Sequence, residues 1–180
     1  MKLTVSKSLA AIHQLDVAVE LLFADRNSLA VRTLAAAAFG LLSDLVEIKS
    51  HGSSWRETLI SDSGLPKKQA LVILHAANNF LKHADRDPDE NLIFDEEEND
   101  YVIFFATLEC GELKHPLSHT MQAFQIWYVA CHREQFGPVT DLLRTATSAL
   151  PGLYLQDRQT QLKRGKEFMK EVLVQYSGLA

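Results

Sequence analysis

The sequence predicts an all-α protein, a single-domain bundle of about seven to eight helices. Apolar residues recur at spacings of three and four along most of the chain, and glycine and proline residues separate these segments. The 180 residues, 47% hydrophobic and 23% charged, suit one domain over 1–180 that buries its own core. Neither alternating strands nor an internal repeat interrupts the pattern, which favours a helical bundle.

The first three helices follow from their caps and their apolar spacing. Ser6 is a suitable cap for a helix that ends near 25–26, and Asn27 caps a second helix expected over 28–49. The second helix is apolar nearly all round and carries four consecutive alanines before Gly40. Small side chains let neighbouring helices approach closely, so we expect this helix at the centre of the bundle. A short third helix should run from Ser54 to about residue 60.

Proline and glycine also delimit the later helices. Gly64-Leu65-Pro66 opens the fourth helix and Arg86-Asp87-Pro88 closes it. A long acidic loop follows, in which 91–94 could be a short extended piece. Further helices are expected over about 97–112, 117–136, 138–150 and 156–175. The last helix is rich in charge and is expected to pack on the outside through Leu162, Phe168, Met169, Val172 and Leu173.

Composition points to a soluble, cytoplasmic protein. The formal net charge of −5 argues against broad adhesion to nucleic acid or to an anionic membrane. Polar residues break the apolar run within the first 24 residues, so no signal peptide is expected, and the apolar run at 33–42 is too short to span a bilayer. Cys110 and Cys131 lie in apolar segments without metal-type spacing, which indicates reduced core thiols.

The fourth helix carries the best candidate site. His75, Asn78, Asn79 and Lys82 fall on one stripe, opposite the apolar residues Ile73, Ala77, Phe80 and Leu81. Histidine and asparagine are poor choices for an ordinary solvated helix face. With His83 and Asp85 at the helix end, the stripe could perform acid/base chemistry or hold a phosphate. A partly solvated helix end, in which His83 complements the helix dipole, explains the same residues.

A second candidate site lies on the first two helices. His13, Asp16 and Glu20 are three and four residues apart, as a metal site needs, and Arg32 could neutralise a carboxylate or hold an anionic ligand. A solvated border with surface ion pairs is the preferred interpretation, because these positions only flank the apolar side of their helix.

Two further patterns resemble metal sites and are not expected to be occupied. Residues 85–96 follow the register of a calcium loop, but Glu90 stands where the turn needs glycine. His115 and His119 have the spacing of zinc ligands, but Pro116 lies between them and indicates a helix entrance instead. Nucleophile signatures and glycine-rich phosphate loops are absent from the sequence, so we predict neither a metal nor a cofactor.

The run Asn78-Asn79-Phe80-Leu81-Lys82-His83-Ala84-Asp85, near the end of a compact helical unit, resembles the HEPN superfamily of helical-bundle proteins. The resemblance implies a homodimer that binds a nucleotide or RNA, often with metal-independent ribonuclease activity. It also implies His83 in the active centre. Where the family places an arginine before that histidine, this chain has Ala76, Ala77 or Asn78.

Three functional hypotheses follow. The first is a HEPN-like binding module for a nucleotide, RNA or partner protein, in which Arg32, Lys82, His75 and Asn78 contact the ligand. The second is an enzyme centred on His83 with Asn79 and Asp85, either a ribonuclease with His83 as general acid/base or a metal-dependent hydrolase that uses His13, Asp16, His83 and Asp85. The third is a structural or antitoxin-like protein that binds no small ligand and uses the stripe as a protein interface.

Overall fold

The computed structural model describes residues 2–49, 53–83, 85, 88–137 and 140–177, and these contain helices and no strand. The prediction of an all-α bundle is confirmed. The α-helices are α1 (Lys7–Phe23), α2 (Ser28–Lys49), α3 (Trp55–Asp62), α4 (Lys67–Phe80), α5 (Glu98–Glu112), α6 (His119–Cys131), α7 (Asp141–Ala149) and α8 (Arg158–Ser177). Two 3-10 helices, η1 (Arg133–Gln135) and η2 (Leu153–Leu155), lie between the later ones.

Side-chain caps start several helices where the sequence predicts them. The Ser6 hydroxyl accepts a hydrogen bond from the Leu9 amide at 3.1 Å, and Asn27 Oδ1 accepts bonds from the Leu29 and Ala30 amides. Ser54 caps α3 in the same way. These side chains satisfy amide groups that the first turn of a helix leaves unpaired, and so fix the first residue of each helix.

Some boundaries differ from the prediction. Helix α4 ends at Phe80, so Lys82 and His83 lie in the turn that follows, where both amides donate to the Asn79 carbonyl. Helix α6 ends at Cys131 and η1 replaces its predicted last turn. Residues 91–94 form no strand. The predicted stops and starts at 50–52, 86–87 and 138–139 lie outside the described residues.

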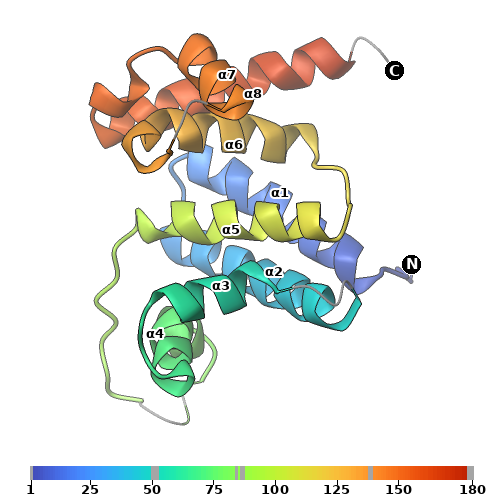
Figure 1. The fold of residues 1–180 in the computed structure, drawn as a ribbon, viewed down its shortest axis with the longest axis vertical. Coiled ribbons are helices and arrows are strands. Elements are labelled where there is room, and N and C mark those ends of the chain that lie inside the picture. The colour runs from blue at the N-terminus through green and yellow to red at the C-terminus, as the bar shows by residue number, and fades with distance from the viewer. Residues whose placement is uncertain (1, 50–52, 84, 86–87, 138–139, 178–180) are drawn as a thin grey trace.

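The helices stack in layers, with α7 and α8 above α6, α1 and α5 in the middle, α2 and α3 below them, and α4 at the lower end (Figure 1). Helix α2 packs on α1 and α5 through Val31, Ala35, Ala38 and Leu42, but Ile48 on its other side is exposed. Residues 30–43 of α2 are all buried or half-buried, so α2 is closely packed as its small side chains predict, but it lies in the layer below α1 and α5, which form the middle of the bundle (Figure 1). By length and composition α2 could cross a membrane, and half of its most apolar window is buried in the bundle.

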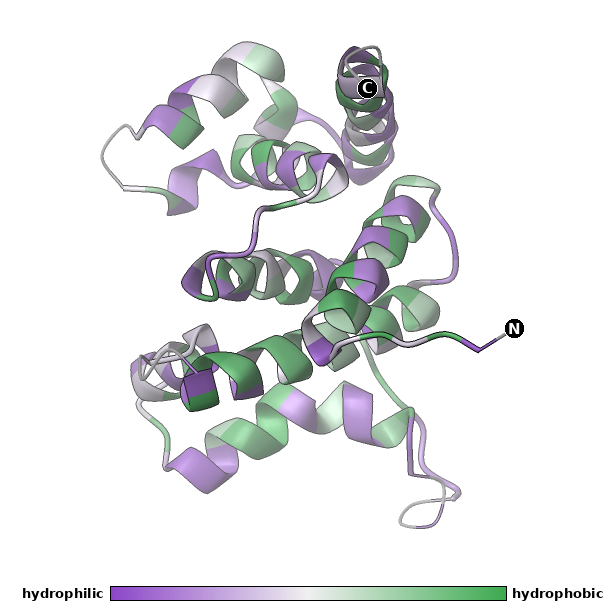
Figure 2. Ribbon diagram, turned by 90° about the vertical axis from the view of Figure 1, so that its right-hand side faces the viewer, coloured by the Kyte–Doolittle hydropathy of each residue, from purple (hydrophilic) through white to green (hydrophobic). Residues whose placement is uncertain are grey.

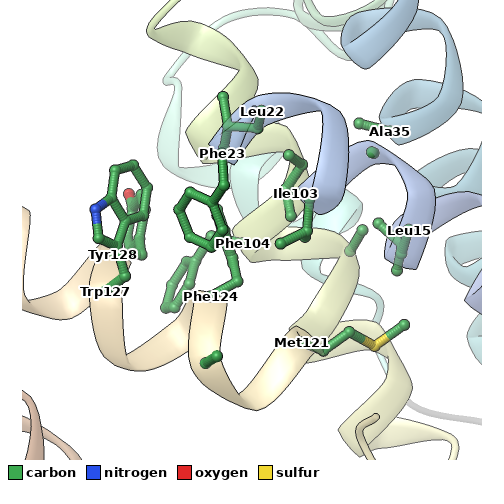
Figure 3. Close-up of a cluster of buried hydrophobic side chains, with 14 of the residues drawn as sticks. Leu15, Leu22, Phe23, Ala35, Ile103, Phe104, Met121, Phe124, Trp127 and Tyr128 are labelled. Carbon is green, nitrogen blue, oxygen red and sulfur yellow. The ribbon is translucent and has the colours of Figure 1, made fainter. Parts of the chain in front are cut away.

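Aromatic side chains fill the junction of α1, α5 and α6 (Figure 3). Phe104 stacks on Tyr128 with ring centres 4.1 Å apart, and Phe23 meets Trp127 edge-on at 5.1 Å. Helix α8 closes this cluster because Gly165, which has no side chain, lies directly against Phe23 and Trp127. As predicted, α8 packs through Leu162, Phe168, Met169 and Val172, but the predicted Leu173 is exposed, and Arg158 at the start of α8 points inward to Asp100.

Candidate functional site

Helix α4 leaves several large apolar side chains exposed. It lies at the lower end of the molecule (Figure 2), and its main contacts are with α2 and α3. Ala70 is its one buried residue. Val72 is 61% exposed and Ile73 is 66% exposed, and Leu65 just before the helix is also exposed. We call Leu65, Val72 and Ile73 the α4 surface.

This orientation corrects the sequence-based view of α4. Ile73, expected on the side opposite the polar stripe and so towards the core, points to solvent, whereas His75 and Asn78 of the stripe are half-buried. The reason is that polar groups on α2 and α3 face α4. The charges that act on His75 are those of Asp44, Arg56 and Lys82. The inner side of α4 is therefore partly polar and its outer side is partly apolar.

His75 lies in this polar interface. Burial lowers the pKa of His75, the positive charges of Arg56 and Lys82 lower it further, and the carboxylate of Asp44 opposes them. The neutral imidazole is thus favoured. Asn78 Oδ1 is buried without a hydrogen-bond partner among the described residues. An orphaned acceptor of this kind destabilises the isolated fold.

The remaining predicted site residues lie towards solvent. Asn79 and Lys82 are exposed. His83 Nδ1 lies 3.9 Å from Asp85 Oδ1, and both side chains are open, at 40% and 80% exposure. At such exposure an ion pair contributes little. The structure thus brings His75 and Lys82 near each other, and His83 near Asp85.

Behind α4, a network of polar side chains joins α2, α3 and α5. Arg56 Nη2 donates to Asp44 Oδ1 and to Glu47 Oε1, each at 2.8 Å. The fully buried carboxyl of Glu109 accepts from the Ser43 hydroxyl at 2.7 Å, and burial raises the pKa of Glu109. Sequence analysis missed this network. The available signal was Glu109 itself, the one acid in the mostly apolar stretch 101–110 of α5.

Arg32 belongs to a different part of the molecule. Its guanidinium donates to Asn99 Oδ1 at 2.9 Å and to Glu98 Oε2 at 2.8 Å, and it lies 4.8 Å from the centre of the Phe94 ring. These partners come from the start of α5 and the segment before it, not from α4. Arg32 therefore neutralises a carboxylate, one of its two predicted roles. It fastens α2 to α5.

Next to Asn99, Asp100 is fully buried and receives two hydrogen bonds from Arg158 of α8, at 2.6 and 2.9 Å. The solvent-filled hollow beside it, of about 480 Å³, has arginines and carboxylates on its walls (Arg26 and Arg158; Asp25, Asp95, Glu96 and Glu97). Such mixed charge selects neither an anion nor a cation.

The other predicted constellations do not converge on a metal site. Asp16 accepts a hydrogen bond from the Ser118 hydroxyl, and burial raises its pKa, while His13 and Glu20 are exposed. His119 stacks on Tyr176 at 4.0 Å. Among the described residues, no three His, Cys, Asp or Glu side chains are placed to hold a metal ion. Residues 86 and 87 of the calcium-like loop are not described.

The two cysteines are inert thiols. Burial raises the pKa of Cys110 to about 12, and it raises the pKa of Cys131 as well. Because the thiolate is the reactive form, neither side chain is poised as a nucleophile. This agrees with the prediction of core thiols.

A pocket of about 170 Å³ opens between α3 and α4, and we call it the α3–α4 pocket. Its lining is apolar except for one serine: Leu59, Ile60, Ser63, Leu65, Ala70, Ile73 and Leu74. It is smaller than the roughly 300–1,000 Å³ sites that hold small organic ligands. Its size and lining suit an apolar side chain.

Comparison of the chain with protein-family models, with curated proteins and with solved structures finds no match. The resemblance to HEPN proteins therefore stays a prediction.

Proposed function

We propose that this protein is a protein-binding module and that the α4 surface is where it binds another polypeptide. One observation carries the proposal: the outer side of α4 carries large apolar side chains that the fold leaves exposed. A helix on the surface of a soluble domain usually turns charged residues outward, whereas Val72 and Ile73 lie side by side in solvent. Burying each of these side chains in an interface contributes about 1.5–3 kcal/mol.

A protein partner is better supported than the nucleotide or RNA of the first hypothesis. A phosphate site usually has several converging cations, but Arg56 is engaged by two carboxylates and Arg32 by Glu98. Among the described residues, Lys82 is the predicted ligand cation that has no ion pair, and it is exposed. The half-buried His75 favours its neutral form. An enzymatic role has less support still, since the His83–Asp85 pair is open to solvent, where water screens the charges.

Photo-crosslinking in the cells that naturally make the chain tests this proposal. A photoreactive amino acid replaces Val72 in one variant and Val174, a similarly exposed valine on α8, in the matched control. We expect a discrete polypeptide adduct from position 72 and none from position 174. The adduct from position 72 should disappear when Ile73→Asp is added. Equal adducts from both positions, or an adduct that survives Ile73→Asp, would refute the proposal.

A further inference from the structure

Helices α3 and α4 contribute little to the hydrophobic core. Each has one buried residue, Ile60 and Ala70, whereas α1 has seven. Neither of these two residues belongs to the main core cluster, and Leu59 and Leu74 are only half-buried against it. Segments with few buried apolar contacts open at a lower free energy than the rest of a protein. Helices α3 and α4 are therefore the part of the bundle that the core secures least.

The two helices are joined to each other. Lys67 of α4 pairs with Glu57 of α3 at 2.6 Å. Apolar side chains of both helices also line the α3–α4 pocket, among them Ile60 of α3 and Leu74 of α4. Neighbouring helices that share such contacts tend to open together as one cooperative unit.

Polar groups hold this unit against α2 and α5. Arg56 of α3 pairs with Asp44 and Glu47 of α2 at 2.8 Å, and its amide donates to Glu109 of α5 at 3.4 Å. Two acceptors, Asn78 Oδ1 of α4 and Glu109 Oε2, are buried without a hydrogen-bond partner among the described residues. Such acceptors gain hydrogen bonds with water when the interface opens, which lowers the free energy of opening.

His75 lies in this interface and has a charge that depends on pH. Burial and the positive charges of Arg56 and Lys82 lower its pKa, and the carboxylate of Asp44 opposes them. Since Arg56 already pairs with Asp44, a proton on His75 would add a third positive charge to the closed interface. Water would solvate that charge in an open form. Glu109 acts in the opposite sense, because burial raises its pKa and the closed form favours its proton.

We propose that α3 and α4 swing away from the bundle as one unit, and that protonation of His75 favours this opening. The movement would release His75 into water. It would also uncover Phe105 of α5, on which Trp55 packs with ring centres 5.9 Å apart. Acidification would thus act as a switch on the inner side of α4, whether or not a partner binds the α4 surface on the outer side.

Hydrogen exchange of the purified full-length protein tests this proposal, with mass spectrometry as the readout and correction for the intrinsic exchange rate at each pH. At about pH 7.5 the amides of α3 and α4 should be protected to a similar extent, and at least about tenfold less than those of α1. At about pH 5.5 the protection of both helices should fall together. An ordinary histidine titrates near pH 6.5, so the fall should be at most about tenfold.

Three variants make the test specific. His75→Gln should remove the acid-induced loss of protection from both helices. His13→Gln is the matched control, because His13 is exposed on α1, and it should behave as the wild type does. Glu109→Gln removes the group that opposes opening at low pH, so its loss of protection should equal or exceed that of the wild type. Retained protection of α1 shows that each variant is folded.

Four results would overturn the proposal. Protection of α3 and α4 equal to that of α1 would show that the two helices do not open separately from the core. A response to pH in α4 without one in α3 would show that they do not move together. A loss of protection that survives His75→Gln would assign the proton to another group. Unchanged protection of Glu109→Gln between the two pH values would show that His75 does not control the opening.

Discussion

Replacement of Gly165 by alanine should destabilise the protein, although alanine is the better helix former. The new Cβ would lie 2.4 Å from Phe23 Cε1 and 2.8 Å from Trp127 Cδ1. Comfortable carbon–carbon contacts are about 3.5–4.0 Å, so α8 would have to move outward by roughly 1 Å. The two aromatic side chains cannot retreat, because both are buried in the core.

The size of the effect follows from two opposing contributions. Overpacking of this kind costs about 1–3 kcal/mol, and contacts to two rings favour the upper half of that range. The higher helix propensity of alanine relative to glycine offsets about 1 kcal/mol of this loss. We expect a net loss of about 1–2 kcal/mol, which lowers Tm by roughly 2–8 °C for a domain of this size.

Gly40→Ala is the control, because Gly40 also lies within a helix but a Cβ there meets no atom within 4 Å. That variant should be unchanged or up to about 1 kcal/mol more stable. Calorimetry and urea unfolding of both variants give the comparison. A second check adds Phe23→Leu to Gly165→Ala, which should cost less than the sum of the two single changes. If Gly165→Ala is as stable as Gly40→Ala, the close approach of α8 is wrong.

Three further predictions concern the polar groups. Arg32→Ala should lower the free energy of unfolding by about 1.5–3 kcal/mol, because it leaves the buried Asn99 acceptor without its charged donor. Arg26 is an exposed arginine nearby, so the control variant Arg26→Ala should hardly change the free energy of unfolding. Equal effects of the two variants would contradict the role of Arg32. The pKa of His75 is lowered below 6.5 in the folded state, so the unfolded chain binds the proton more readily and stability should fall as the pH falls below about 6.5. Denaturant unfolding between about pH 8 and pH 5 should show a smaller decline for His75→Gln, and identical slopes would count against a buried His75. The pKa of Glu109 is raised above 4.5, so the stabilisation that comes from its protonated form is fully present at low pH and is lost as the pH rises through the folded-state pKa. Glu109→Gln keeps an oxygen that can accept the Ser43 hydrogen bond, so this variant should gain stability relative to the parent towards neutral pH. Parallel pH profiles of the two proteins would refute this.

The helices could be predicted from the sequence because their determinants are local. Ser6, Asn27 and Ser54 cap helices through bonds to amides two or three residues away, and apolar spacing defines the segments between. The end of α4 was predicted too late, because Arg86-Asp87-Pro88 marks only the last position that the helix could reach. The chain leaves the helix earlier, in the turn at Lys82 and His83.

The candidate site was only partly predictable, because its arrangement depends on contacts between distant segments. The stripe on α4 was recognised, but which side of α4 faces the protein is decided by Asp44 and Arg56, whose position relative to His75 no local pattern encodes. Periodicity identifies the faces of a helix but not their neighbours.

The bidentate bond between Arg158 and Asp100 makes the charged last helix indispensable. Most charged side chains of α8 are on the surface, so the helix looks removable. It nevertheless supplies the guanidinium for a carboxylate that has no access to water. Loss of the Arg158 side chain, with the rest of α8 in place, would leave that carboxylate buried without its guanidinium, at a cost of several kcal/mol. Shortened versions of this protein should therefore retain Arg158, and fusion partners are better attached beyond α8 than substituted for it.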